Sequence, residues 1–131
     1  MERNLHRPEA DIACAMRYAL APQRVEGGGL VALGSWESYG KEELRPAQQE
    51  GFLLDRGVYL IQFSAETRSA GAAVTLNGAR LVYLEAAPEA RRRRVTLQGI
   101  VRLDAPGTLA VRNNGEGEGV FSGAVLTALK L

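Results

Sequence analysis

Residues 58–65 read VYLIQFSA, and this stretch decides the fold class. The residues that recur at every second position are Tyr59, Ile61, Phe63 and Ala65. Successive side chains of a strand point to opposite faces, so these four would form one apolar face of an extended chain. An apolar period of two therefore predicts a β-strand here, because a helix would need spacings of three and four.

The same period recurs along the chain, interrupted by turn residues. Asn77-Gly78 lies between two apolar arms within residues 72–84, and it is a strong hairpin signal because both residues tolerate positive φ. Further strands are predicted at 30–39, 51–54, 94–103, 108–112 and 120–131. Eight or nine short strands separated by glycine, proline and asparagine predict an all-β sandwich or barrel of antiparallel strands over residues 27–131.

Residues 1–26 differ from the rest and are predicted to be a separate N-terminal leader that ends at the glycines 27–29. From Pro8 to Leu20 the pattern favours a short helix, because proline suits a first helical turn and the apolar residues would share one face. That face comprises Ile12, Met16, Ala19 and Leu20. An equally open alternative is an irregular leader that becomes ordered only against a neighbouring subunit.

Composition limits the partners and the chemistry. The chain has 131 residues and a formal net charge of +1, so no overall field favours nucleic acid or an anionic membrane as a partner. Its single cysteine, Cys14, excludes an intrachain disulfide and a cysteine-rich zinc site. No apolar stretch is long enough to predict a signal peptide or a membrane span.

The last predicted strand has small or apolar residues on both faces, although a sandwich strand needs only one apolar face. Straight alternation assigns the core face to Phe121, Val125, Leu129 and Leu131. The other face would be an exposed apolar patch, prone to association, if it met water. We therefore expect an oligomer interface that comprises Val58, Leu60, Val120, Ala124, Leu126 and Ala128. The alternative is that the N-terminal segment covers these strands within a monomer.

Five segments in order resemble a known family. They are GVYLIQF (57–63), VTLNG (74–78), VTLQGIVRL (95–103), APGTLAVRNN (105–114) and AVLTALKL (124–131). Together they resemble the globular C-terminal domain of the collagen-like spore-surface (exosporium) glycoproteins of bacilli and related Firmicutes. That domain belongs to the jelly rolls similar to tumour necrosis factor and to complement heads.

This resemblance covers residues 30–131 and implies a jelly-roll sandwich of two antiparallel sheets. It also implies a tight homotrimer around a threefold axis, with the strand at 58–65 and the last strand in the interface. The Gly-X-Y collagen repeat of these proteins is not found in this sequence, so a spore-coat role does not follow directly.

The run Arg91, Arg92, Arg93 and Arg94 is the sharpest charge feature. One interpretation is contact with a polyanion such as a sulfated glycan, since clustered arginines concentrate positive potential. No aromatic residues interleave with the run, which disfavours nucleic acid. The other interpretation is an exposed loop paired with Glu85 and Glu89 of the same or a neighbouring subunit.

Catalytic, cofactor and metal sites are not predicted. His6 is the only histidine, so neither a histidine-based metal trio nor a catalytic triad can be assembled. Two acidic clusters lack the spacing of a calcium loop and are expected to be solvated carboxylates: Glu42, Glu43 and Glu50, and Glu116 and Glu118. Trp36 and Tyr39 could form an aromatic platform for a sugar, although strand tryptophans are more often core or interface residues.

Two functional hypotheses follow, and neither is enzymatic. The first is a structural or interaction module that forms a homotrimer on a bacterial spore or cell surface. The alternative is a lectin-like or cytokine-like domain that binds a glycan or a receptor in grooves between subunits or at residues 91–94. No cofactor, nucleic acid or membrane partner is expected.

Overall fold

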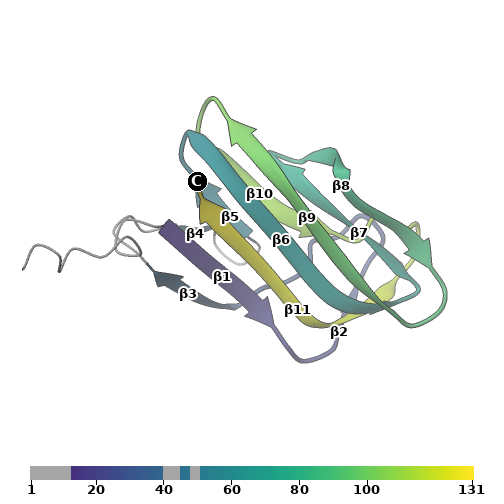
Figure 1. Cartoon of the computed structure of the whole chain (residues 1–131). Helices are drawn as coiled ribbons and strands as arrows, with labels where there is room; N and C mark the ends of the chain where they lie inside the picture. Colours follow the sequence, from purple (N-terminus) through teal and green to yellow (C-terminus); the bar gives the residue numbers. More distant parts are fainter. Residues whose placement is uncertain (1–12, 40–44, 48–50) are drawn as a thin grey trace, which may run out of the picture.

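The computed structural model describes residues 13–39, 45–47 and 51–131, and it is a sandwich of two antiparallel sheets (Figure 1). This confirms the predicted jelly-roll fold class. The described residues form eleven strands, more than the eight or nine expected. The surplus includes two strands from the predicted leader.

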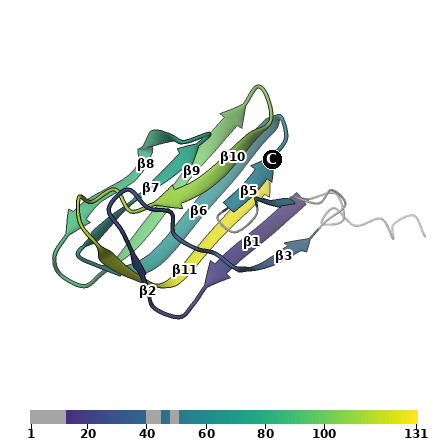
Figure 2. The ribbon, with the colours of Figure 1, turned by 180° about the vertical axis from the view of Figure 1, so that it is seen from behind.

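Sheet A has the strand order β3-β1-β11-β6-β9, with β2 paired to the beginning of β11. Its strands are β1 (Ala13–Ala19), β2 (Gln23–Val25), β3 (Ser35–Tyr39), β6 (Gly57–Arg68), β9 (Arg93–Leu103) and β11 (Gly119–Lys130). Sheet B has the order β4-β5-β10-β7-β8 and lies behind sheet A in Figure 1 and in front of it in Figure 2. Its strands are β4 (Arg45–Ala47), β5 (Gly51–Leu54), β7 (Ala70–Leu76), β8 (Ala79–Glu89) and β10 (Gly107–Arg112).

The core lies between the two sheets and contains the apolar face predicted for β6. Tyr59, Ile61 and Phe63 are fully buried. They belong to one cluster with Phe52 of β5 and Leu109 of β10, which come from sheet B. Interdigitation of the two inner faces buries apolar area at about 25 cal/mol per Å², which is the main driving force for this architecture.

The predicted hairpin around Asn77-Gly78 is confirmed as the connection from β7 to β8. Asn77 and Gly78 have φ values of 53° and 87°, as the hairpin turn requires. The Asn77 Oδ1 also accepts a hydrogen bond from the Thr108 amide at 2.9 Å. This bond ties the turn to the beginning of β10.

A bulge in β11 overturns part of the predicted face assignment. The register with β6 shifts between Ser122 and Val125, where Gly123 has a φ of 61°. The additional residue moves every later side chain to the opposite face. Ala124, Leu126 and Ala128 are therefore fully buried in the core, and their predicted place on the outer face is wrong.

The helix predicted from Pro8 to Leu20 is wrong for the part that the structure describes. Residues 13–19 form β1, which pairs with β11 on one side and β3 on the other. Its buried positions are Ala13, Ala15 and Arg17, so the strand alternates between the core and the outside. The period was hard to read because the inward residues are two small alanines and one arginine.

A candidate interaction surface on the outer face of sheet A

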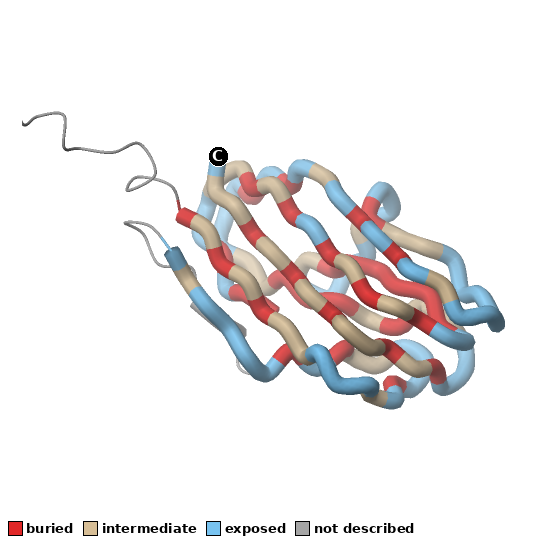
Figure 3. The backbone as a smooth tube through the Cα atoms, turned by 60° about the horizontal axis from the view of Figure 1, so that its bottom comes forward, coloured by how far each residue is buried: buried red, intermediate tan, exposed pale blue. Residues whose placement is uncertain are grey.

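The outer face of sheet A presents a central band of nine residues on the neighbouring strands β1, β11 and β6. These are Cys14, Met16, Tyr18, Leu60, Gln62, Ser64, Val125, Thr127 and Leu129. Figure 3 shows buried residues alternating with less buried ones along these strands. None of the nine carries a formal charge at neutral pH, which is unusual for a sheet face that meets water.

An apolar row crosses the whole sheet at one edge of the central band. Strand register places the following residues side by side: Tyr39, Cys14, Leu129, Leu60 and Ile100. Tyr39 and Ile100 at its two ends are 54% and 58% exposed. Next to the row, the Leu131 amide donates a hydrogen bond to the Val58 carbonyl at 2.8 Å. The side chains of Leu131 and Val58 therefore extend the apolar row. Such a continuous strip marks an interaction site more often than a bare surface.

The structure separates the six predicted interface residues into two groups. Val58, Leu60 and Val120 lie on the outer face of sheet A, whereas the other three are core residues because of the bulge at Gly123. Val125 and Leu129, assigned to the core from straight alternation, lie outside instead. A glycine inside a strand pattern often marks a bulge, so Gly123 was the signal that could have corrected the phase.

A hydrogen-bonded cluster closes the β3 edge of this face. Glu37 accepts hydrogen bonds from Tyr18 Oη, at 3.3 Å, and from Tyr39 Oη. The bond to the Glu37 carboxylate, together with its negative charge, raises the pKa of Tyr39. Trp36 lies opposite Arg17 in the strand register and therefore on the inner face of the sheet, whereas Tyr39 lies on the outer face. Trp36 and Tyr39 thus do not form a sugar platform.

Burial also affects the thiol in the apolar row. Cys14 is partly buried beside Leu129 and Tyr39, and desolvation of the thiolate raises its pKa. A raised pKa makes the thiol less nucleophilic at neutral pH. The thiol therefore has the properties of a packing residue.

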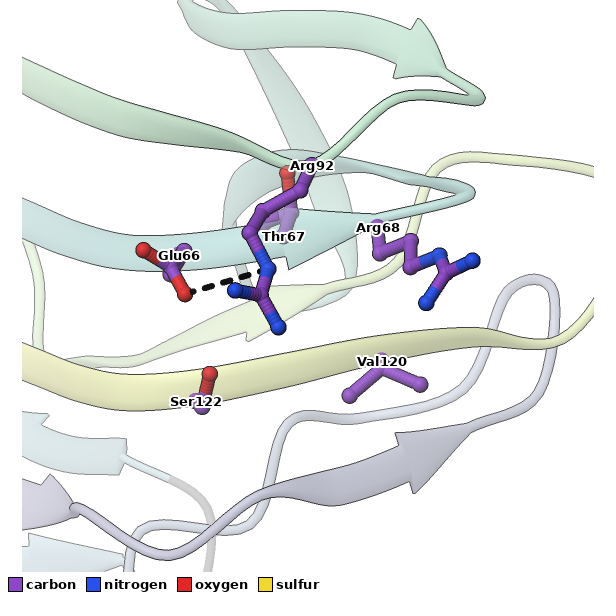
Figure 4. Close-up of a pocket in the computed structure, with 6 residues that line it drawn as sticks. All are labelled: Glu66, Thr67, Arg68, Arg92, Val120 and Ser122. Carbon is purple, nitrogen blue, oxygen red and sulfur yellow. Dashed lines mark ion pairs between the residues drawn. The ribbon is translucent and has the colours of Figure 1, made fainter.

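The opposite end of the face is basic, and we call it the basic end. It comprises Arg24, Arg68, Arg92 and Arg94, with Glu66, Glu118, Val120 and Ser122. Register places Arg24 beside Val120 and Val120 beside Arg68. In the same way Arg94 lies opposite Glu66. The guanidinium of Arg92 reaches across β6 toward β11 and lies 3.6 Å from Glu66 (Figure 4).

The predicted run of four arginines is therefore divided. Arg92 and Arg94 belong to the basic end, whereas Arg93 turns away and donates a hydrogen bond to the Ala87 carbonyl. Arg91 is exposed in the turn before β9. Glu85, considered as a partner of the run, instead pairs with Arg80 at 3.0 Å.

Sequence reasoning missed two arginines of the basic end. Arg68 continues the outward alternation of β6, and it was overlooked because the strand was predicted to end at Ala65. Arg24 reaches the face through β2, which was assigned to the leader. Nothing in the local pattern around Arg24 indicated that its segment pairs with a strand about ninety residues later.

The residues that the structure describes contain no group of three or more histidine, cysteine or acidic side chains that could hold a metal ion. His6 and the cluster Glu42, Glu43 and Glu50 lie outside them. Within the same part of the chain, no helix has the length and apolar character needed to cross a bilayer.

Among the comparisons with known proteins, only the one with solved structures finds similar proteins. No protein-family profile matches its sequence, and no curated protein is similar to it in sequence. Murine APRIL superposes with a TM-score of 0.64 at 17% identity and covers 92% of this chain and 100% of its own. Pika GITRL gives a TM-score of 0.62 at 11% identity and covers 92% of this chain and 97% of its own.

A third similar structure is the globular domain of a zebrafish complement 1qA protein. Its TM-score is 0.61 at 11% identity, and the match covers 90% of this chain and 94% of that domain. Identities this low carry information about the fold alone. The chain has the jelly-roll fold shared by domains similar to tumour necrosis factor and to the complement head.

Proposed function

We propose that this protein is a non-enzymatic interaction module that assembles as a homotrimer through the outer face of sheet A. The observation that carries the proposal is the uncharged central band with its adjoining apolar row. Removing a few hundred Å² of such surface from water would stabilise an assembly by several kcal/mol before association costs.

The absence of charge in the central band favours a second copy of this chain as the occupant. In a homo-oligomer every charge on a shared face is repeated in each copy, and like charges brought together cost free energy. The nine residues of the band avoid that cost. Glu37, the one acidic residue of β3, lies at the edge, where the hydroxyls of Tyr18 and Tyr39 donate hydrogen bonds to it.

The number three comes from the sequence resemblance to the exosporium glycoprotein domain. That resemblance implies an interface that includes β6 and β11, and these strands contribute two thirds of the central band. It also supports a role on a bacterial spore or cell surface. On this basis Val58, Leu60 and Val120, the three predicted interface residues that lie on the outer face, are within or beside the interface.

Light scattering on a size-exclusion peak tests the assembly. We expect about three times the chain mass of 14.1 kDa for the wild type, and a monomer for Leu60→Glu. Val82→Glu is the matched control, because Val82 is 79% exposed on β8 of sheet B and should leave the trimer intact. A monomeric wild type at micromolar concentration, or equal masses for the two variants, would overturn the proposal.

A further inference from the structure

We propose that the basic end of sheet A binds a sulfated or phosphorylated polyanion that lacks aromatic bases, and that this binding strengthens the assembly. The site itself follows from the arrangement of four arginines on one face. The coupling to assembly rests on the homotrimer proposed above. The two parts therefore make separate predictions.

The arginines come from three separate segments that the fold brings together. Arg24 lies on β2, Arg68 ends β6, and Arg94 lies near the start of β9. Arg92 reaches the same face from the turn that precedes β9. Two acidic residues, Glu66 and Glu118, share the area, so the basic end has a net charge of +2 (four minus two) in a chain whose net charge is +1.

The ion pairs within the basic end leave its guanidiniums available to a ligand. The Arg92 and Glu66 side chains are 71% and 43% exposed and lie 3.6 Å apart. Arg24 and Glu118 are 3.4 Å apart and also well exposed. Solvent-exposed pairs of this kind contribute little to stability, and a guanidinium has five donors, so each arginine can bind an oxyanion as well.

A shallow hollow lies between two of these arginines, Arg68 and Arg92. It measures about 100 Å³ and is lined by Glu66, Arg68, Arg92, Val120 and Ser122, together with Thr67 (Figure 4). The two β11 residues in it have short side chains, and the guanidiniums of Arg68 and Arg92 lie over the gap between β6 and β11 (Figure 4). A volume of this size holds several water molecules or one tetrahedral oxyanion.

The spacing of the arginines favours a ligand with several linked anionic groups over a single isolated anion. From Arg24 on β2 the face crosses β11 to Arg68 on β6. Because neighbouring strands are about 4.8 Å apart, these two backbones are separated by about 10 Å, and Arg94 lies one strand further. A sulfated sugar chain or a polyphosphate can contact all of these positions together, and a single sulfate cannot.

The absence of aromatic side chains at the basic end disfavours nucleic acid. Proteins that bind single strands combine a basic groove with aromatic residues on which bases stack. The described residues that line the hollow have no ring among them. Recognition here would depend on oxyanions and arginines alone, as in bidentate pairing of guanidinium with sulfate or phosphate.

Assembly and polyanion binding should be coupled in a cyclic trimer. Equivalent residues of the three copies lie at the same height along the axis, so the basic ends add to a formal charge of about +6 at one level. Their mutual repulsion opposes assembly at low salt, and a polyanion that neutralises it binds the trimer better than the monomer. A ligand with this preference shifts the equilibrium toward the trimer.

Calorimetric titration of the full chain at 50 mM and 200 mM salt tests the site. The probes are a heparin hexasaccharide, inorganic polyphosphate and an oligothymidylate of similar charge. We expect the first two to bind, at least tenfold more weakly at the higher salt, and the better of them identifies the source of the oxyanions. Tighter binding of the oligothymidylate would overturn the proposed ligand class.

Two charge-matched variants locate the site. Arg68→Gln/Arg92→Gln removes two positive charges from the basic end and should weaken binding about tenfold or more. Arg56→Gln/Arg102→Gln removes two charges from the hollow at the other end of the face and should change affinity less than threefold. Equal losses in the two variants would show non-specific attraction and overturn the site.

The mass of the protein, measured by light scattering during dilution, separates the two proposals. If the chain is a monomer but Arg68→Gln/Arg92→Gln still loses binding, the site stands and the homotrimer fails. If the chain is a trimer, we expect the polyanion to lower the concentration at which it dissociates by about threefold or more. A trimer whose dissociation the polyanion leaves unchanged would overturn the coupling.

Discussion

The buried guanidinium of Arg17 on β1 donates a hydrogen bond from Nη1 to the carbonyl oxygen of Gly51 on β5, at 2.9 Å. This bond joins sheet A to sheet B, and a second one, from Nη2 to Gly34, is 3.4 Å long. Arg17 is only 1% exposed, so its charge depends on partners within the protein in place of water. A strand predicted as part of a helical leader thus contributes a polar link through the core.

Replacing Arg17 with alanine should lower the free energy of unfolding by about 3 kcal/mol, because it removes charged hydrogen bonds and leaves the buried Gly51 carbonyl without this donor. The measurement is urea unfolding at one protein concentration. Arg24→Ala is the control, since its pair with Glu118 is exposed and should matter by less than about 1 kcal/mol. Similar losses in both variants would contradict a special role of Arg17.

Asn113 should be as sensitive as Arg17, because it is fully buried and uses both ends of its amide. Its Nδ2 donates to the carbonyls of Val25 and Gly117 at 3.0 and 3.1 Å, and its Oδ1 accepts from the Gly115 amide at 2.9 Å. Asn113→Ala should therefore cost about 2–4 kcal/mol of unfolding free energy. A loss below about 0.5 kcal/mol would show that the loop rearranges without cost.

The isosteric change Asn113→Asp adds a dependence on pH. A buried carboxylate facing two carbonyls cannot donate to them, so the folded state would raise the pKa of this aspartate above its unfolded value. The folded form then binds more protons, and the variant should become less stable as pH rises from about 4 to 7, relative to wild type. Urea midpoints measured across this range check the sign, and a difference that stays constant would contradict it.

Gly123 produces the bulge that sets which face of β11 is buried, and its φ of 61° favours glycine. A Cβ at this position would meet nothing within 4 Å, so backbone strain alone opposes a side chain. Gly123→Ala should cost about 1 kcal/mol and Gly123→Asn less, because asparagine tolerates the left-handed region. Equal costs for both variants in thermal unfolding would contradict backbone strain as the cause.

This bulge also explains how far the fold could be predicted. Sequence periodicity located β6 and the Asn77-Gly78 hairpin because their signals are local: two-residue alternation and a turn that needs positive φ. Alternation cannot show where a strand inserts an additional residue, so every face assignment after Gly123 was reversed. Of the six residues predicted for an interface, Val58, Leu60 and Val120 therefore lie on the outer face as expected, and the other three do not.

The predicted N-terminal helix and the assignment of β2 to the leader were wrong for a different reason, namely pairing between distant segments. β1 gains its stability from register with β11, more than one hundred residues away, and its inward residues are not strongly apolar. The basic end is similar, because Arg24 and Arg68 become neighbours of Arg92 only through the sheet. Local composition identified residues 91–94 as a charge feature, but it could not select which of the four face one surface.

The thiol of Cys14 gives an independent test of whether the outer face of sheet A is covered in solution. Burial raises its pKa above the ordinary value, so at pH 7 the thiolate fraction is small and alkylation by iodoacetamide should be slow. The rate should rise about tenfold per pH unit until the raised pKa is reached, because the thiolate is the nucleophile. This pH dependence is expected for a monomer as well as for an assembly, because it follows from the burial of Cys14 within one chain.

Assembly would slow the same reaction further, because Cys14 lies in the apolar row next to Leu129 and two strands from Leu60. Leu60→Glu, designed to dissociate the trimer, should therefore react at least about tenfold faster than wild type at one pH, whereas Val82→Glu on sheet B should match wild type. Circular dichroism establishes that both variants remain folded. If Leu60→Glu stays folded and reacts at the wild-type rate, no partner covers this row, and the central band must serve some purpose other than self-association.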